Sequence, residues 1–114
     1  MAKYVLSVWH DEEYEVDFSS EVAQRLVQQV GAFNQRLIDA GALVFGDGLL
    51  PASTASFARP DGTATAGPYN TDPRQMGGFW VVEAPDRATA DRWLVEASAA
   101  CEGVVELRPM QHHD

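Results

Sequence analysis

The chain has 114 residues, a hydrophobic fraction of 46% and a formal net charge of −9 at pH 7. This length predicts one domain over residues 1–114, large enough for a hydrophobic core but small enough to gain from burial in a dimer. Because the excess charge is acidic, we expect no basic surface that neutralises phosphates. Nucleic acid and anionic membrane surfaces are therefore not expected partners.

Cysteine content and the N-terminus give the expected compartment. Cys101 is the only cysteine, which excludes an internal disulfide and a thiolate zinc cage. We expect it to be a small buried hydrophobic side chain, because a reactive thiolate needs positive surroundings and Glu102 follows it. No signal peptide is evident before the first apolar run, and no apolar run reaches the roughly 20 residues of a membrane helix. The sequence predicts a soluble, cytoplasmic protein.

The first half of the chain predicts a strand, a helix and a second strand. Residues 3–9 are β-branched and aromatic with apolar side chains on both faces, which is typical of an inner strand. A helix is expected from Ser19 or Ser20, as N-cap, to Gly41, which supplies a left-handed stop. Residues 42–45 predict a short strand, and Gly46-Asp47-Gly48 predicts a bulge or corner after it. The expected apolar stripe of the helix is Val22, Leu26, Val30, Phe33, Leu37 and Ala40.

The second half predicts an insertion followed by a similar pattern. An Asp-Gly pair at 61–62 lies between extended segments, which predicts an inserted β-hairpin. The polar segment 66–78 contains two prolines and leads into a strand over residues 79–84. Asp86 should cap a second helix to about residue 100, and residues 104–109 should form the last strand. The expected stripe of that helix is Ala90, Trp93, Leu94 and Ala97.

This order, β-α-β, hairpin, β-α-β, predicts an α+β domain whose helices cover only one face of the sheet. In the last two strands, Trp80, Val82, Val105 and Leu107 form an apolar set that should meet the helices. The alternate set, with Phe79, Val81, Glu83, Val104, Glu106 and Arg108, mixes apolar and charged residues. Its face should lie against a second sheet or a cavity, so we expect a homodimer.

Three segments of the chain carry a recognisable family pattern. Its residues are Gly41-Ala42-Leu43, Gly46-Asp47-Gly48-Leu49, Pro51, Ser53-Thr54-Ala55, Arg59, Gly67-Pro68-Tyr69, Gln75-Met76-Gly77-Gly78-Phe79, Glu83, Pro85-Asp86 and Glu106-Leu107-Arg108-Pro109. Together they resemble the YCII-related family, and specifically its branch named after an Asp-Gly-Pro-Phe (DGPF) motif. The resemblance implies a ferredoxin-like, split βαβ domain that associates into a dimeric α+β barrel. The family's function is largely uncharacterised, and relatives of this branch are often companions of extracytoplasmic-function sigma factors, which implies a regulatory partner.

The chain departs from the family pattern at three positions. In the better-known branch a His and Asp dyad implies catalysis, but the expected positions are occupied here by Val30 and Ser98. Ala66 stands where the motif has its leading Asp. The resemblance therefore implies a fold and a dimer more directly than an activity.

In addition to the loop over residues 66–78, two groups of residues are candidates for a functional site. That loop is either a binding site or a cover for the sheet edge. His10, with Asp11 and Glu12, could form an acid/base group or be a solvated strand end. Arg59 and Arg108 could clamp an anionic group, with Tyr69 and Trp80 as aromatic walls. Alternatively, the two arginines could pair with Glu83, Glu106 or Asp47. The predicted ligand-binding set is Asp47, Arg59, Tyr69, Glu83 and Arg108.

Metal and cofactor sites are not predicted. His112 and His113 lie at the terminus, where a metal would need further ligands. Gly46-Asp47-Gly48 lacks the helix that a dinucleotide fingerprint requires, and no Walker loop or Ser-His-Asp order occurs. The sequence favours a small homodimeric domain that binds a small molecule or acts as an accessory or regulatory module. The alternative is a cofactor-independent enzyme of the dimeric α+β barrel type.

Overall fold

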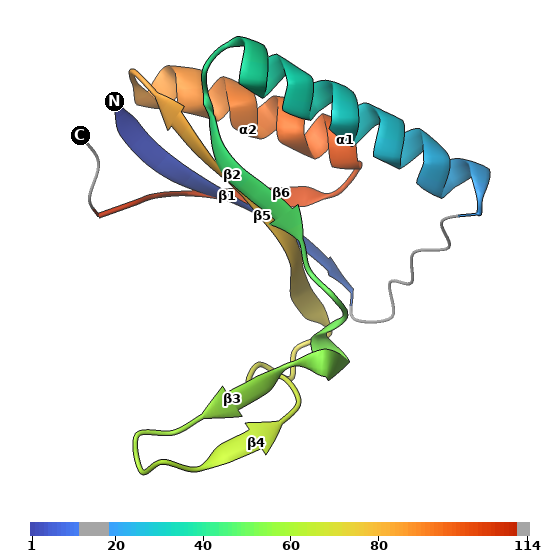
Figure 1. The fold of residues 1–114 in the computed structure, drawn as a ribbon, viewed down its shortest axis with the longest axis vertical. Helices are drawn as coiled ribbons and strands as arrows, with labels where there is room; N and C mark the ends of the chain where they lie inside the picture. Colours follow the sequence, from blue (N-terminus) through green and yellow to red (C-terminus); the bar gives the residue numbers. More distant parts are fainter. Residues whose placement is uncertain (12–18, 112–114) are drawn as a thin grey trace.

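The structure is a computed structural model that describes residues 1–11 and 19–111 (Figure 1). Two long helices and four longer strands make up its main body, in agreement with the α+β class predicted from the sequence. In chain order the elements are β1 (Ala2–Asp11), α1 (Glu21–Asp39), β2 (Leu43–Gly48), the 3-10 helix η1 (Ala52–Thr54), β3 (Ser56–Ala58), β4 (Ala64–Ala66), β5 (Arg74–Ala84), α2 (Arg87–Cys101) and β6 (Val104–Pro109).

The main sheet has the order β2-β5-β1-β6, and every neighbouring pair is antiparallel. The two central strands therefore come from opposite halves of the chain, and each β-α-β unit contributes one central and one edge strand. This is the ferredoxin-like arrangement that the sequence predicts. Strands β3 and β4 form a separate two-stranded antiparallel sheet.

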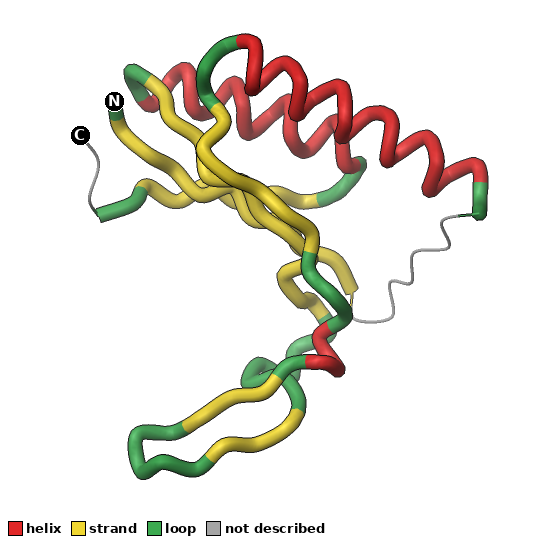
Figure 2. The backbone as a smooth tube through the Cα atoms, viewed as in Figure 1, coloured by secondary structure: helices red, strands yellow, loops and turns green. Residues whose placement is uncertain are grey.

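Both helices lie on the same face of the main sheet, as Figure 2 shows. The Ser20 hydroxyl oxygen accepts from the Ala23 amide at the start of α1, and Gly41 takes a left-handed φ of 68° after its end, as predicted. The predicted stripe is wrong at its two ends, because Val22 and Ala40 are exposed and Ala23 is buried instead. The helix is thus anchored mainly by its second half, through Phe33 and Leu37.

The hydrophobic core lies between the helices and the covered face of the sheet. Phe33, Leu6, Leu37 and Val82 are its largest fully buried side chains. The Phe33 ring packs edge-on against Trp80, with ring centroids 5.2 Å apart. Trp80, Val82 and Leu107 belong to this core and Val105 packs against it, which confirms the predicted alternation.

Helix α2 begins as predicted and is joined to α1 by charged side chains. The Asp86 carboxylate accepts from the Thr89 amide at 2.8 Å, and Ala90 and Ala97 are buried. At the other end, the carboxylate of Glu102 accepts two hydrogen bonds from the Arg25 guanidinium of α1, at 3.0 and 3.2 Å. The helix pair is therefore held by small buried residues inside and by an exposed bidentate ion pair at one end.

Strand β2 is longer than predicted, because Gly46, Asp47 and Gly48 continue the strand instead of turning it. Gly46 lies opposite Trp80, and a Cβ at position 46 would be 2.8 Å from Cδ1 of that indole. The glycine is needed to admit the Trp80 ring rather than to bend the backbone. The register irregularity of this strand falls earlier, between Leu43 and Phe45.

Residues 49–73 form a projection that we call the arm, which comprises η1, β3, β4 and the turns around them. In Figure 1 the arm hangs from one end of the sheet, on the side away from the helices. Its two strands pair only with each other, with Ser56 opposite Ala66. The arm therefore depends little on the core for its own backbone hydrogen bonds.

The sheet face opposite the helices, which we call the open face, has no layer packed on it within the described residues. Alternation along the strands places Val5, Phe79 and Val81 there, together with Phe45, which is 56% exposed. The Phe45 and Phe79 rings lie 5.8 Å apart. Among the described helices, none combines the length and apolar character needed to span a membrane.

Candidate functional site

A cavity of about 290 Å³ lies between α1 and the end of the sheet formed by β2 and β5. Four glycines of these two strands contribute backbone to it, and α1 contributes side chains. Its volume is close to the lower end of the range of roughly 300–1,000 Å³ that is usual for ligand pockets. The lining residues are Val8, Val30, Asn34, Gly46, Asp47, Gly48, Gly77, Gly78, Phe79, Trp80 and Cys101.

The side-chain amide of Asn34, in the cavity wall, is held in a fixed orientation. The indole Nε1 of Trp80 donates to Oδ1 of Asn34 at 2.8 Å, and the Trp80 ring is itself packed against Phe33. The amide nitrogen of Asn34 has no hydrogen-bond partner among the described residues, and it is not sealed from the cavity or solvent. Asn34 thus offers two N–H donors to whatever occupies the cavity.

The thiol of Cys101 also lines the cavity and is half-buried. Its pKa is raised above the ordinary value, chiefly because burial penalises the thiolate. Backbone hydrogen bonds at Gly103 and at Cys101 itself act in the opposite direction but do not outweigh burial. The thiol also donates to the carbonyl oxygens of Ser98 and Gly103, at 3.8 and 4.0 Å. Cys101 is therefore a neutral thiol near pH 7, not an activated nucleophile.

Asp47 is the only predicted site residue in the cavity wall. It lies opposite Phe79 in the ladder, and alternation puts its side chain on the open face with those of Phe45 and Phe79. The carboxylate accepts from the Gly48 amide at 2.8 Å. Asp47 therefore borders the cavity through its backbone, and its charge lies on the other side of the strand.

His10 lies near the same end of the sheet but is not among the residues that line the cavity. Its ring packs against Gly77, which does line it. The ring nitrogen Nδ1 is 2.9 Å from the carbonyl oxygen of Asp11, so a hydrogen bond there requires a proton on Nδ1. The imidazole thus lies next to a residue that lines the cavity, without being one of the lining residues itself.

Arg59 and Tyr69 are brought together on the arm. The Arg59 guanidinium lies 5.9 Å from the Tyr69 ring centroid and 5.6 Å from that of Phe57, and the two rings meet edge-on. Tyr69 is 72% exposed. Within residues 1–11 and 19–111, Arg59 forms no ion pair. The group is an exposed cation and aromatic surface well away from the cavity.

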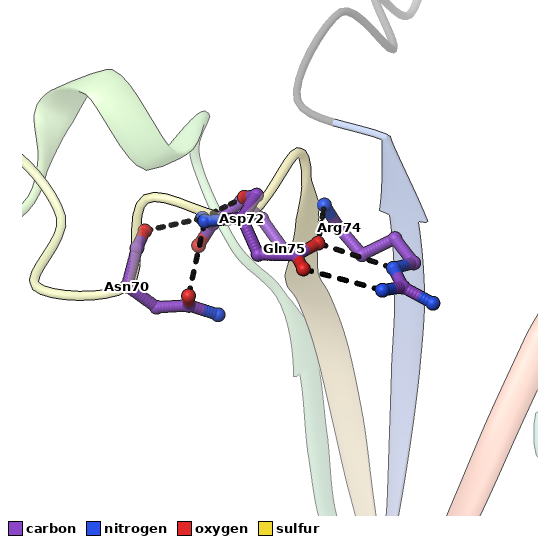
Figure 3. Close-up of polar contacts among 4 residues, drawn as sticks. All are labelled: Asn70, Asp72, Arg74 and Gln75. Atoms are coloured by element: carbon purple, nitrogen blue, oxygen red, sulfur yellow. Dashed lines mark hydrogen bonds and ion pairs between the residues drawn. The ribbon is translucent and has the colours of Figure 1, made fainter.

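The loop that leads into β5 is closed by its own hydrogen bonds (Figure 3). The Asn70 side chain accepts from the Asp72 amide, and the Asp72 carboxylate accepts from the backbone and guanidinium of Arg74. The buried amide of Gln75 donates to the carbonyl oxygens of Asn70 and Asp72 at 2.7 and 2.8 Å. These contacts fix the loop where it joins the sheet, but they use the polar groups that a ligand would need.

Glu83 and Arg108 lie on other parts of the sheet. Glu83 is 3.7 Å from the Lys3 ammonium, which it faces across the β1–β5 ladder. Arg108 lies opposite Val5 on edge strand β6, is exposed, and forms no ion pair with any residue that the structure describes. The predicted ligand-binding set is therefore spread over the cavity wall, the arm and the open face.

The positions that the family resemblance assigns to a dyad are apolar or already bonded. Val30 lines the cavity, while the Ser98 hydroxyl donates to the Gly103 carbonyl at 2.6 Å. Sequence reasoning missed Asn34 as a site residue. The sequence does show that Asn34 is a polar residue directly after Phe33, on a helix whose apolar stripe faces the sheet. It does not show that Asn34 accepts a hydrogen bond from Trp80, which is 46 positions away.

In the part of the chain that the structure describes, no group of His, Cys, Asp and Glu side chains is arranged to hold a metal ion. His112 and His113 lie outside the described residues. Comparison with curated proteins gives no match. The family model of the YCII-related domain matches residues 2–112. With nearly the whole chain matched and a ferredoxin-like sheet observed, the chain belongs to the YCII-related domain family.

Proposed function

We propose that this protein is a small homodimeric YCII-related domain of the DGPF branch whose function is to bind a small molecule in the cavity beside Asn34. The observation that carries the proposal is the cavity of about 290 Å³ with an oriented amide in its wall. Such a combination of apolar lining and a few fixed polar groups is typical of small-molecule sites. A protein that binds a small molecule without catalysing a reaction would have an accessory or sensory role.

The side chains favour binding over catalysis. Among the described residues that line the cavity there is no His, Lys or Arg, and the Cys101 thiol is neutral at physiological pH. The Asp47 carboxylate belongs to the other face of its strand. The nearest candidate for a general acid or base is His10, whose ring packs against Gly77 in the cavity wall. The cofactor-independent enzyme stays the alternative, and its strongest candidate residue is His10.

The proposal is tested by filling the cavity. Val30→Phe places a larger side chain in its wall, whereas Val27→Phe changes an exposed residue on the same helix and serves as the matched control. We expect fragments that bind the unmodified protein, as detected by ligand-observed NMR, to lose binding in Val30→Phe and keep it in Val27→Phe. A fragment set that shows no binder, or binders indifferent to Val30→Phe, would contradict the proposal.

The homodimer part of the proposal is supported by the open face. Val5, Phe79 and Val81 are only partly covered there, and Phe45 and Val104 are 56% and 69% exposed. A second copy placed sheet to sheet would bury these side chains and stabilise both chains. Arg108 forms no ion pair with a described carboxylate, and Glu106 and Glu83 of a second copy are its candidate partners.

The dimer is tested by placing a charge on the open face. Val81→Arg should convert a dimer to a monomer in sedimentation equilibrium, because an unpaired buried charge is costly. Val95→Arg, on an outer helix surface where the native side chain is 69% exposed, is the control and should leave the assembly unchanged. A monomer in the unmodified protein, or a dimer that survives Val81→Arg, would contradict this part.

A regulatory protein partner is the second candidate role, favoured by one observation. The outer helix surfaces expose Val27, Ile38 and Val95 at 54–69%. A partner that docks on the helices and is recovered in a pull-down with the unmodified protein should be lost with Val27→Arg and retained with Val81→Arg. A pull-down that recovers nothing specific would leave the small-molecule proposal alone.

A further inference from the structure

We propose that the ligand of the Asn34 cavity is an uncharged molecule with an apolar body and a hydrogen-bond acceptor, such as a neutral ketone, aldehyde, ester or amide. This inference rests on the proposed function and names the chemical class that the same cavity would select. It excludes phosphorylated and carboxylate-bearing compounds as the preferred ligands.

The acceptor requirement follows from the Asn34 amide. Because Trp80 Nε1–H donates to its Oδ1, the oxygen is engaged at 2.8 Å and the amide cannot be turned without losing that bond. What remains is the NH₂ group, a pure donor. A ligand oxygen that accepts from it would satisfy the group, whereas a ligand donor at the same place would not.

The absence of charge follows from the other lining residues. No Lys, Arg or His is among the described lining residues, although the His10 ring packs against the lining residue Gly77. The carboxylate of Asp47 alternates onto the open face. Its negative charge still opposes an anionic ligand across one strand. Burial of a ligand charge without a partner would cost more than the amide contact returns. A neutral acceptor is therefore favoured over a carboxylate of the same shape.

The apolar body follows from the rest of the wall. Val8, Val30 and the Trp80 ring provide hydrocarbon and aromatic surface, and the neutral thiol of Cys101 behaves as a small polarizable apolar group. The glycines of β2 and β5 add flat backbone without side chains that would fill the space. With about 290 Å³ available, the ligand must be compact.

The test uses four probes of nearly the same shape, namely acetophenone, benzoate, benzylamine and ethylbenzene. Binding is measured by NMR titration of the Trp80 indole and Asn34 side-chain amide resonances in the full-length protein. We expect acetophenone to bind about tenfold more tightly than ethylbenzene, the ratio that one net hydrogen bond supplies. Benzoate should also bind more weakly than acetophenone, because its charge has no partner in the cavity wall.

Asn34→Asp is the discriminating variant, because its carboxylate can still accept from Trp80 Nε1 but has no N–H to donate. We expect it to remain folded, to lose about tenfold in acetophenone affinity and to gain for benzylamine. Val30→Phe, which occludes the cavity from a different side, should abolish binding of every probe.

The outcomes separate the two proposals. Benzoate binding as tight as acetophenone, or unchanged acetophenone affinity in Asn34→Asp, overturns the ligand class; if Val30→Phe still abolishes binding, the cavity remains a small-molecule site. Failure of all four probes to shift the Trp80 and Asn34 resonances, in a protein whose unfolding is cooperative, overturns the ligand class. If a wider fragment set also fails, the proposed function is overturned with it.

Discussion

The imidazole of His10 lies against Gly77 of the neighbouring strand and occupies the space that a Cβ at position 77 would need. This contact falls at the point where β1 and β5 change register. Val8 is opposite Gly78 and Trp9 is opposite Met76, which leaves Gly77 as the extra residue of a β-bulge. The Gly77 carbonyl accepts from the Leu49 amide at 2.9 Å, so the bulge also marks where the arm leaves the sheet.

Gly77→Ala should therefore displace the His10 ring and destabilise the protein. The added methyl group overlaps Nε2 and Cδ2 of the His10 ring, so the ring has to shift. We expect a loss of about 1–3 kcal/mol in the free energy of unfolding, as is usual for overpacking, together with a changed His10 ring resonance in NMR spectra. The free energy is measured by urea unfolding.

The control for this variant is Gly31→Ala. A Cβ at Gly31, in the middle of α1, would meet nothing within 4 Å. It should stabilise the protein by about 0.5–1 kcal/mol, because alanine has the higher helix propensity. Equal stability of the two alanine variants would show that the His10 ring moves aside without cost.

Gly46→Ala should perturb the Trp80 side chain. The new methyl would lie 2.8 Å from the Trp80 Cδ1 and 3.0 Å from the Phe79 carbonyl oxygen, so the indole has to shift. We expect a loss of about 1–3 kcal/mol in the free energy of unfolding and an altered tryptophan signal in near-UV circular dichroism. Gly48→Ala is the matched control, since its nearest neighbour would be the Gly77 carbonyl at 4.0 Å. Similar spectra for both variants would refute the steric role of Gly46.

The sequence predicts the fold well because the determinants of the fold are local. The serine and aspartate caps, the left-handed Gly41 and the alternation through Trp80 and Val82 are each visible within a few residues. The sequence fails at Gly46-Asp47-Gly48, where a corner is predicted and a strand is found. The reason is non-local, since Gly46 makes room for Trp80, which is 34 positions later.

The candidate site could not be predicted from the sequence for the same reason. Asn34 and Trp80 are joined by a hydrogen bond between a helix and a strand from different halves of the chain. The predicted residues Arg59 and Tyr69 do meet, but on the arm. The prolines and polar residues of 68–75 suggested a binding loop, whereas the structure has them closing a turn on itself. Polar composition does not distinguish a ligand site from a self-bonded turn.

The ion pair between Arg25 and Glu102 should make a small, pH-dependent contribution to stability. The Arg25 guanidinium, with help from the Gln29 amide, lowers the pKa of the Glu102 carboxyl below its ordinary value of 4.5. The contribution is therefore fully present above that value and is lost as the pH falls through the lowered pKa of the folded state. Both side chains are exposed, so solvent screening keeps the effect modest.

This prediction is checked by NMR titration of the Glu102 carboxyl. In Arg25→Ala the pKa should rise toward the ordinary value, whereas Arg87→Ala, which breaks a different ion pair with Asp91, should leave it unchanged. A Glu102 titration that is the same in all three proteins would contradict the assignment of the shift to Arg25.

The tip of the arm should be removable without loss of the fold. Ser56 and Ala66 are register partners, so residues 57–65 can be replaced by an Asn-Gly turn that joins the two strand ends. The bond from the Gly67 amide to the Ala55 carbonyl and the closed turn at residues 70–75 both remain. We expect the free energy of unfolding to change by less than about 1 kcal/mol, because a shorter loop lowers the entropic cost of closure and the lost contacts are exposed. Cooperative thermal unfolding at two protein concentrations is the measurement. A large loss of stability, or one that depends on concentration, would mean that Phe57 and Arg59 pack against something other than their own arm.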